Sequence, residues 1–144
     1  MARWQVERCI QQWTPGEVEV NDVLEQVGRD EWWVDSDFGA IRAAIRLSEA
    51  DDLVWPRSDD RAGYIHGLMV AREAAGRGLG SQTLGWAEKE IVDRGLHLAR
   101  LDCVATNVVL RSFYRARGFE ERGIMDFGSG SKWHPVMRFE KRLS

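Results

Sequence analysis

Residues 75–81 read Ala-Gly-Arg-Gly-Leu-Gly-Ser and stand between an apolar run, residues 64–70, and a run with helical spacing, residues 83–94. This order predicts a strand, a glycine loop and a helix. Glycines at 76, 78 and 80 remove every second side chain, so the backbone can turn tightly and its N–H groups can converge on one point. The helix adds unpaired first-turn N–H groups and the positive end of its dipole. The stretch therefore predicts a site for an anion such as phosphate or pyrophosphate.

The residues around the loop argue against two common phosphate sites. A Walker-type loop ends in Gly-Lys-Ser/Thr, whereas Gly80-Ser81 lacks the lysine. A dinucleotide site needs an acidic residue at the end of the next strand, about twenty positions on, but Asp102 lies inside its predicted strand. A glycine loop alone also fits a plain turn, so the wider context decides.

That context is a set of motifs in one order and spacing: Leu68-Met69-Val70, the glycine loop, Asn107 leading a helix that carries Phe113-Tyr114, and Gly118-Phe119. Here the chain resembles the GNAT superfamily of N-acetyltransferases, over about residues 40–143. The family's loop reads Gln/Arg-x-x-Gly-x-Gly/Ala and is followed by an Asn-led helix with a tyrosine and a closing Gly-Phe. Ala75 replaces the family's Gln/Arg, which removes a side-chain contact to the cofactor and leaves the backbone cradle unaffected.

The patterns predict an α/β fold with a mixed, mostly antiparallel sheet flanked by helices, as in GNAT proteins. The predicted helices cover residues 2–12, 21–27, 83–94 and 107–117, and the predicted strands cover residues 31–34, 40–47, 64–70, 98–104, 119–127 and 133–143. GNAT domains usually open with a strand ahead of the first helix. This chain has no room for one before Ala2, so we expect that strand to be missing or displaced.

Composition indicates an ordinary soluble chain with a single domain over residues 1–144. No apolar run approaches the length of about eighteen residues that a membrane span needs, and the N-terminus lacks a signal-peptide core. We therefore expect a cytoplasmic protein that binds no membrane. Cys9 and Cys103 have no metal-type spacing and are expected to be free thiols.

Charge is divided unevenly. Residues 1–62 hold 14 acidic and 7 basic side chains, a balance of −7, and residues 63–144 hold 9 and 13, a balance of +4. The basic half contains the glycine loop, as a ligand with several phosphates would prefer. Neither half has the dense basic stripe of a nucleic-acid binder, so no nucleic-acid partner is expected. The acidic half favours an acceptor that is cationic in solution.

The resemblance implies acetyl-CoA as co-substrate and no metal. The residues it implies around acetyl-CoA are Met69, Val70, Gly76, Arg77, Gly78, Leu79, Gly80, Ser81, Asn107 and Tyr114. The loop amides would hold the pyrophosphate, and the strand end at Met69 and Val70 would pair with the pantetheine arm as an added strand does.

The reaction implied is direct attack of an amine on the thioester in a ternary complex. Tyr114 is the candidate general acid, because a phenol with a pKa of about 10 can protonate a departing thiolate. His66 is the candidate base, predicted to share a strand face with Leu68; a packed histidine is the alternative, and His134 is a weaker rival. Asp102 is interpreted as structural, and residues 48–61 as a solvated acidic loop.

The acceptor stays open between small-molecule amines and peptide or protein amines. Gln12, Trp13 and Glu17 are candidate wall residues of its pocket. A homodimer is compatible with the sequence. The competing class is a catalytically silent acyl-CoA-binding sensor, against which the presence of Tyr114 argues.

Overall fold

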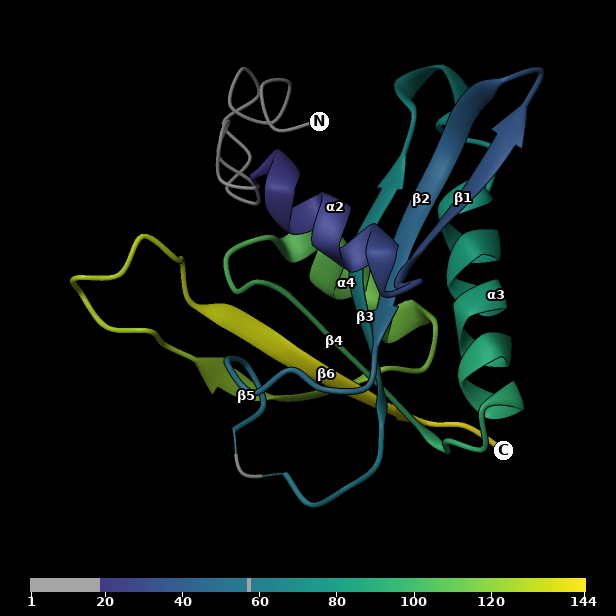
Figure 1. Cartoon of the computed structure of the whole chain (residues 1–144). Coiled ribbons are helices and arrows are strands. Elements are labelled where there is room, and N and C mark those ends of the chain that lie inside the picture. Colours follow the sequence, from purple (N-terminus) through teal and green to yellow (C-terminus); the bar gives the residue numbers. More distant parts are fainter. Residues whose placement is uncertain (1–18, 57) are drawn as a thin grey trace.

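The computed structural model describes residues 19–56 and 58–144 (Figure 1). Several predictions concern residues outside these ranges: the helix over residues 2–12, Cys9, and the wall residues Gln12, Trp13 and Glu17. The prediction about a first strand also concerns residues outside these ranges. The elements run in the order α2 (Val20–Gly28), β1 (Trp32–Asp37), β2 (Ala40–Ser48), β3 (Gly63–Val70), η1 (Arg72–Ala74), α3 (Leu79–Asp93), β4 (Leu98–Val104), α4 (Val108–Ala116), β5 (Glu120–Met125) and β6 (Val136–Arg142).

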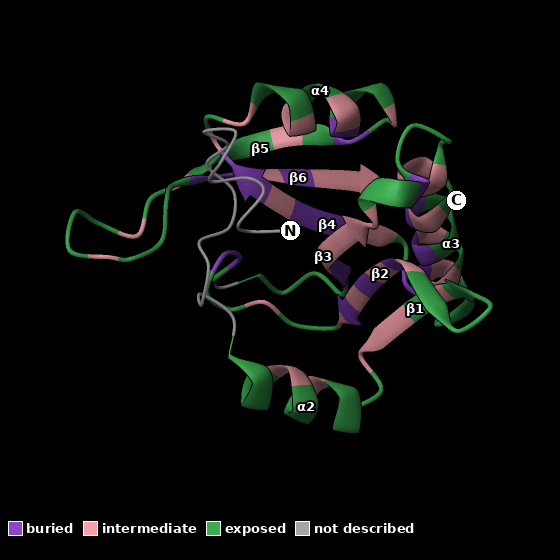
Figure 2. Ribbon diagram, turned by 90° about the horizontal axis from the view of Figure 1, so that it is seen from above, coloured by how far each residue is buried: buried purple, intermediate pink, exposed green. Residues whose placement is uncertain are grey.

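The described strands form one open, six-stranded sheet with the order β1-β2-β3-β4-β6-β5. Its pairs are antiparallel except for β3 and β4, which run parallel. The predicted mixed, mostly antiparallel sheet is therefore confirmed. α3 lies against β2, β3 and β4, α4 lies beside β5, and α2 lies near β1 at the other end of the sheet (Figure 2).

The parallel pair holds only at the start of the two strands. Gly63 pairs with Ala99 and Tyr64 pairs with Arg100, and no later residues of the two strands pair. Beyond this point β3 continues beside β2, while β4 continues beside β6, and Figure 1 shows the strands diverging. We call residues 65–70 of β3 and 101–104 of β4, which do not pair with each other, the β3–β4 separation. Along residues 65–70 no other described strand takes the place of β4 beside β3.

A bulge in β3 changes which side chains share a face. Ala44 and Arg46 of β2 are two residues apart but pair with Met69 and His66, which are three apart. The extra residue lies beside Gly67, whose φ is +60°, a left-handed conformation that suits glycine. Leu68 consequently packs against the main core on the other face from His66, so the prediction that the two share a face was wrong.

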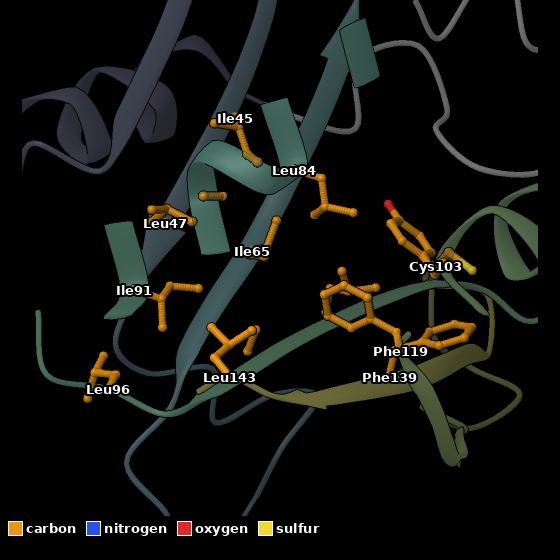
Figure 3. Close-up of a cluster of buried hydrophobic side chains, with 14 of the residues drawn as sticks. Ile45, Leu47, Ile65, Leu84, Ile91, Leu96, Cys103, Phe119, Phe139 and Leu143 are labelled. Carbon is orange, nitrogen blue, oxygen red and sulfur yellow. The ribbon is translucent and has the colours of Figure 1, made fainter. Parts of the chain in front are cut away.

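The main core lies between the sheet and helices α3 and α4. α3 buries Leu84, Ala87 and Ile91, whose spacing of three and four residues places them on one helix face. Gly63 is required beneath Ile91, because a Cβ at Gly63 would lie 2.4 Å from Ile91 Cγ1. Figure 3 shows Leu84 and Ile91 meeting side chains of the sheet. At the far end of α3, Gly95 with φ +76° reverses the chain, next to the predicted end of the helix at residue 94.

α2 contributes no buried side chain. The helix begins at Val20 with Glu19 as N-cap, one residue before the predicted start at residue 21. Its apolar side chains remain largely open, with Leu24 61% and Val27 50% exposed. No helix within residues 19–56 and 58–144 combines the length and apolar character that a membrane span requires.

The connection between β2 and β3 is anchored, contrary to the prediction of a solvated loop. Val54 and Trp55 are buried in a second cluster with Tyr64, on the face of the sheet away from α3. Arg100 of β4, only 3% exposed, stacks 4.5 Å from the Trp55 ring and bonds to Asp60 at 2.9 Å. These contacts fix the path of the loop across the sheet.

Candidate active site

The glycine loop lies at the end of β3, as predicted, but the helix begins earlier than expected. α3 starts at Leu79 rather than at residue 83, with Gly78 as N-cap. The first hydrogen bond of the helix runs from the Gln82 N–H to the Gly78 carbonyl oxygen. The N–H groups of Leu79, Gly80 and Ser81 therefore form the unpaired first turn, where the helix dipole favours an anion.

The space inside this loop is open. Gly76 and Gly78 have φ values of +77° and +74°, and a Cβ built on either would meet no atom within 4 Å. Arg77, between them, is exposed. Glycine is required here by backbone conformation, and the same residues leave room for a ligand against the N–H groups.

α4 supports the loop through contacts that the sequence did not reveal. Arg117 donates a hydrogen bond from Nε to Ser81 Oγ at 2.8 Å and stacks 3.6 Å from the Phe113 ring. A Cβ at Gly80 would lie 3.7 Å from Phe113, so the loop packs closely on α4. The Arg117 side chain thus places a cation beside the first turn of α3.

Asn107 confirms its predicted local role. Its Oδ1 accepts a hydrogen bond from the Leu110 N–H at 3.1 Å and caps α4. A direct contact from Asn107 to a cofactor stays a prediction.

Tyr114 is carried by α4 into the main core. It is 7% exposed, and its ring lies 5.5 Å from Phe139 and 5.3 Å from Phe113 between centroids. Burial, followed by the charges of Cys103 and Asp102, raises the pKa of the Tyr114 hydroxyl above its usual value of about 10. The hydroxyl has no hydrogen-bond partner among the described residues. The Tyr114 ring is part of the main core. Its role as general acid stays a prediction.

His66 stands at the β3–β4 separation in a group of polar side chains. A ring nitrogen of His66 and one carboxylate oxygen each of Asp51 and Asp102 all lie within 4.8 Å of one another. We call these residues the polar triad. It is the one such group in the described ranges with the donor atoms to hold a cation, either an ammonium group or a metal ion.

The environment of the triad shifts all three pKa values. Burial, assisted by Arg46, lowers the pKa of His66 to about 4, so the imidazole is neutral at pH 7. Burial, assisted by Asp51, raises the pKa of Asp102 to about 7. Burial also raises the pKa of Asp51. The interpretation of Asp102 as a structural residue missed this grouping, and a lone carboxylate inside the apolar strand Leu98–Val104 was the available signal.

The other histidines and the described cysteine show no such grouping. His134 is exposed in the segment before β6, and the His97 carbonyl oxygen accepts a hydrogen bond from the Leu143 N–H. Cys103 is a buried free thiol whose pKa burial raises to about 12.

The open mixed sheet, the β3–β4 separation and the glycine loop at the end of β3 define a GNAT-like fold. The model of the acetyltransferase (GNAT) family matches residues 1–119, and the chain belongs to this family. Acetyl-CoA transfer is general in the family, which places the chain among the acyltransferases.

Individual relatives agree with this assignment. The chain is 33% identical to the uncharacterized N-acetyltransferase YesJ of Bacillus subtilis (strain 168), over 99% of this chain and 79% of YesJ. The crystal structure of a GNAT family acetyltransferase from Listeria monocytogenes superposes with a TM-score of 0.80 at 26% identity, covering 99% of this chain and 83% of that one. A Bacillus subtilis acetyltransferase in complex with CoA shares the fold, with a TM-score of 0.68 at 17% identity, covering 90% of this chain and 86% of that one.

Proposed function

We propose that residues 1–144 form a single N-acetyltransferase domain that moves the acetyl group of acetyl-CoA to an amine by direct attack in a ternary complex. The observation that carries this proposal is the open glycine cradle at the end of β3, beside the edge of the same strand that does not pair with β4. The N–H groups of the glycine loop suit phosphates, and the edge of β3 suits an extended arm that carries amides.

Acetyl-CoA would bind along this line. The N–H groups of Gly76 to Ser81 would hold the pyrophosphate, with Arg117 adding positive charge nearby. The pantetheine arm would enter the β3–β4 separation and pair with Met69 and Val70 on the edge of β3 that β4 leaves free. The thioester would then lie near the middle of the sheet.

The chemistry needs a neutral amine and a way to stabilise charge on sulfur. The amine nitrogen attacks the carbonyl carbon, the carbon–sulfur bond breaks, and the thiolate takes a proton. A free backbone N–H at the end of β3 would polarise the carbonyl. Tyr114 would give a hydrogen bond and then a proton to the sulfur, and its raised pKa limits this contribution because it makes the phenol a weaker acid.

The test compares acetyl-CoA binding in two glycine variants with matched backbone strain. Gly78 and Gly95 have φ values of +74° and +76° and open surroundings, but only Gly78 lies in the cradle. Asp is among the residues tolerated in this conformation. Gly78→Asp places a carboxylate beside the phosphates and should raise the calorimetric Kd by about tenfold or more, because like charges a few Å apart repel by roughly 1 to 4 kcal/mol.

Gly95→Asp should bind acetyl-CoA as the wild type does. Equal affinity of a folded Gly78→Asp protein would contradict the cradle. Thiol release from acetyl-CoA in the presence of simple amines, followed with a thiol reagent, separates an enzyme from a silent sensor, since a sensor would bind acetyl-CoA and release no thiol.

A further inference from the structure

We infer that the polar triad, Asp51, His66 and Asp102, binds the ammonium group of the acceptor amine and is the part of the site that selects for it. The inference rests on the proposed function, because it names the acceptor of that reaction. It also assigns the loop between β2 and β3 to the acceptor site.

The sheet register brings two of the three residues together. Tyr64 pairs with Arg100, and the same register, continued by two residues, sets His66 opposite Asp102 where the strands have parted. Both side chains point to the face of Tyr64 and Arg100, away from α3. Asp51 reaches the same place from the loop, within 4.8 Å of the other two.

The loop is held so that Asp51 stays there. Asp51 Oδ1 accepts a hydrogen bond from the Val54 N–H at 3.3 Å, and Val54 and Trp55 are buried against Tyr64. Farther along the loop, Asp60 forms an ion pair with Arg100 of β4. Arg100 also forms an ion pair with Glu140 of β6. Two carboxylates that repel each other are therefore kept together by contacts made elsewhere.

Among the described residues, no cation forms an ion pair with a carboxylate of the triad. Arg46 is in electrostatic range of His66 and Asp51, but it forms its ion pair with Glu31 at 2.7 Å. Asp51 and Asp102 face one another, and within residues 19–56 and 58–144 the Asp102 carboxylate accepts no hydrogen bond. Two neighbouring half-buried carboxylates without a cation are costly in the free protein and favour binding of a positive group.

The hydrogen-bonding groups suit an ammonium group in number. Ser48 Oγ donates its single proton to the Ala50 carbonyl oxygen at 3.0 Å, so it accepts from His66 Nε2–H, also at 3.0 Å. The lone pair of the neutral ring is then on Nδ1. Together with one oxygen of Asp51 and one of Asp102 this makes three acceptors for the three donors of R-NH₃⁺.

The size of the triad suits the same group. Three acceptors at about 2.8 Å from one tetrahedral nitrogen stand about 4.6 Å apart. The three triad atoms, one of them a ring nitrogen of His66, lie no more than 4.8 Å apart, so one ammonium nitrogen can reach all three. Secondary and tertiary amines have fewer donors and bulkier carbon substituents, so they would leave a carboxylate without a partner.

The position also suits the reaction. Asp102 lies in electrostatic range of Tyr114, which approaches the β3–β4 separation from the opposite face of the sheet. His66 precedes the bulge that leads to Met69 and Val70. An amine held by the triad would therefore stand between the two parted strands, beside the place proposed for the thioester.

The proton balance is complete. R-NH₃⁺ gives one proton to Asp102, whose raised pKa suits this step at neutral pH, and that proton later leaves to solvent. The neutral nitrogen forms its bond to the carbonyl carbon as the carbon–sulfur bond breaks. The nitrogen loses a second proton and the thiolate gains one, so the products are the amide, CoA thiol and one released proton.

The experiment measures KM for 1,4-diaminobutane and for glycine with acetyl-CoA, in wild type, Asp102→Asn, Asp51→Asn and Asp59→Asn. Asp59 is an exposed acidic residue of the same loop and serves as the matched control. We expect the two triad variants to raise KM for the diamine at least tenfold without changing the Kd for acetyl-CoA, and the control to change neither. Glycine, whose carboxylate the triad repels, should be a poor acceptor in every case.

Each contrary result has a distinct meaning. Unchanged KM values in both triad variants, with wild-type turnover intact, would overturn the inference and leave the proposed function standing. If the wild-type protein does not bind acetyl-CoA, the proposed function itself is overturned. Turnover that needs a divalent metal and is abolished by a chelator would show that the triad binds a metal ion, which would also overturn the inference.

A binding measurement covers the case in which no tested amine turns over. Calorimetry of 1,4-diaminobutane with the protein–CoA complex should show binding that both triad substitutions weaken at least tenfold. Absence of binding to the wild-type complex would overturn the inference.

Discussion

Replacing Asp102 by asparagine should stabilise the folded protein, because the fold holds this carboxylate in an unfavourable place. Burial and Asp51 raise its pKa to about 7, against about 3.9 for a free aspartate. Each pKa unit corresponds to about 1.4 kcal/mol, so the ionised group destabilises the native state by at most about 4 kcal/mol. Water reaches part of this half-buried side chain, so we expect a gain of about 2 to 3 kcal/mol from the substitution.

The sign and the pH window follow from the raised pKa. Between about pH 4 and pH 7 the folded state binds more protons at Asp102 than the unfolded state, so wild-type stability falls as the pH rises through this range. The gain from Asp102→Asn is therefore full above pH 7 and fades as the pH falls towards 4. For a domain of this size it corresponds to a rise in Tm of about 5 to 10 °C at pH 8.

The assay is thermal unfolding of wild type, Asp102→Asn and Asp59→Asn at pH 4.5, 6 and 8. The exposed control should show no pH-dependent gain. A lower Tm for Asp102→Asn at pH 8, or an equal gain at pH 4.5 and pH 8, would refute the reasoning that Asp102 is ionised at a cost. If the triad also binds the acceptor, the stabilised variant should be the poorer enzyme, as is common for functional charges.

Three further substitutions test other parts of the molecule. Gly67→Ala should destabilise the fold by about 1 to 3 kcal/mol in denaturant titration, because φ is +60° and the new Cβ would lie 2.7 Å from Trp32 Cη2; unchanged stability would remove the need for the bulge. Tyr114→Phe should lower kcat by about 10²-fold with little change in acetyl-CoA affinity, and an unaltered single-turnover rate would leave Tyr114 as a packing residue only. His66 has a pKa lowered to about 4, so it should contribute no ascending limb to kcat/KM near the usual histidine value of about 6.5. An ascending limb near pH 7 should come from Asp102 and persist in His66→Ala; a limb that disappears in His66→Ala would contradict the burial of His66 as a neutral ring.

Local signals in the sequence predicted much of the framework. Asn107 caps α4 as expected, Gly95 ends α3, and β4 has the predicted bounds, because each of these depends on residues within one turn or one strand. The order of strand, glycine loop and helix was visible for the same reason. The early start of α3 at Leu79 was missed because glycines at 78 and 80 argue against helix by propensity, although first-turn positions tolerate them.

The missed features depend on contacts between distant residues. Strict alternation along β3 put Leu68 on the face of His66, and only the pairing of β3 with β2 reveals the extra residue at the bulge. Asp51 was interpreted as part of a solvated loop, because the neighbouring sequence does not show that Arg100, far along the chain, anchors that loop. The polar triad therefore could not be assembled from spacing alone, although Asp102 in an apolar strand was a visible anomaly.

The most direct test of acetyl-CoA binding at the glycine loop is an NMR titration of isotope-labelled protein with acetyl-CoA, followed at assigned backbone amides. We predict that the amide signals of Gly76, Gly78, Gly80 and Met69 shift or broaden until saturation, whereas that of Gly39 in the β1–β2 turn stays in place. Saturable binding that leaves the four predicted amides unmoved, or no binding at all, would contradict the placement of acetyl-CoA between the glycine loop and the open edge of β3.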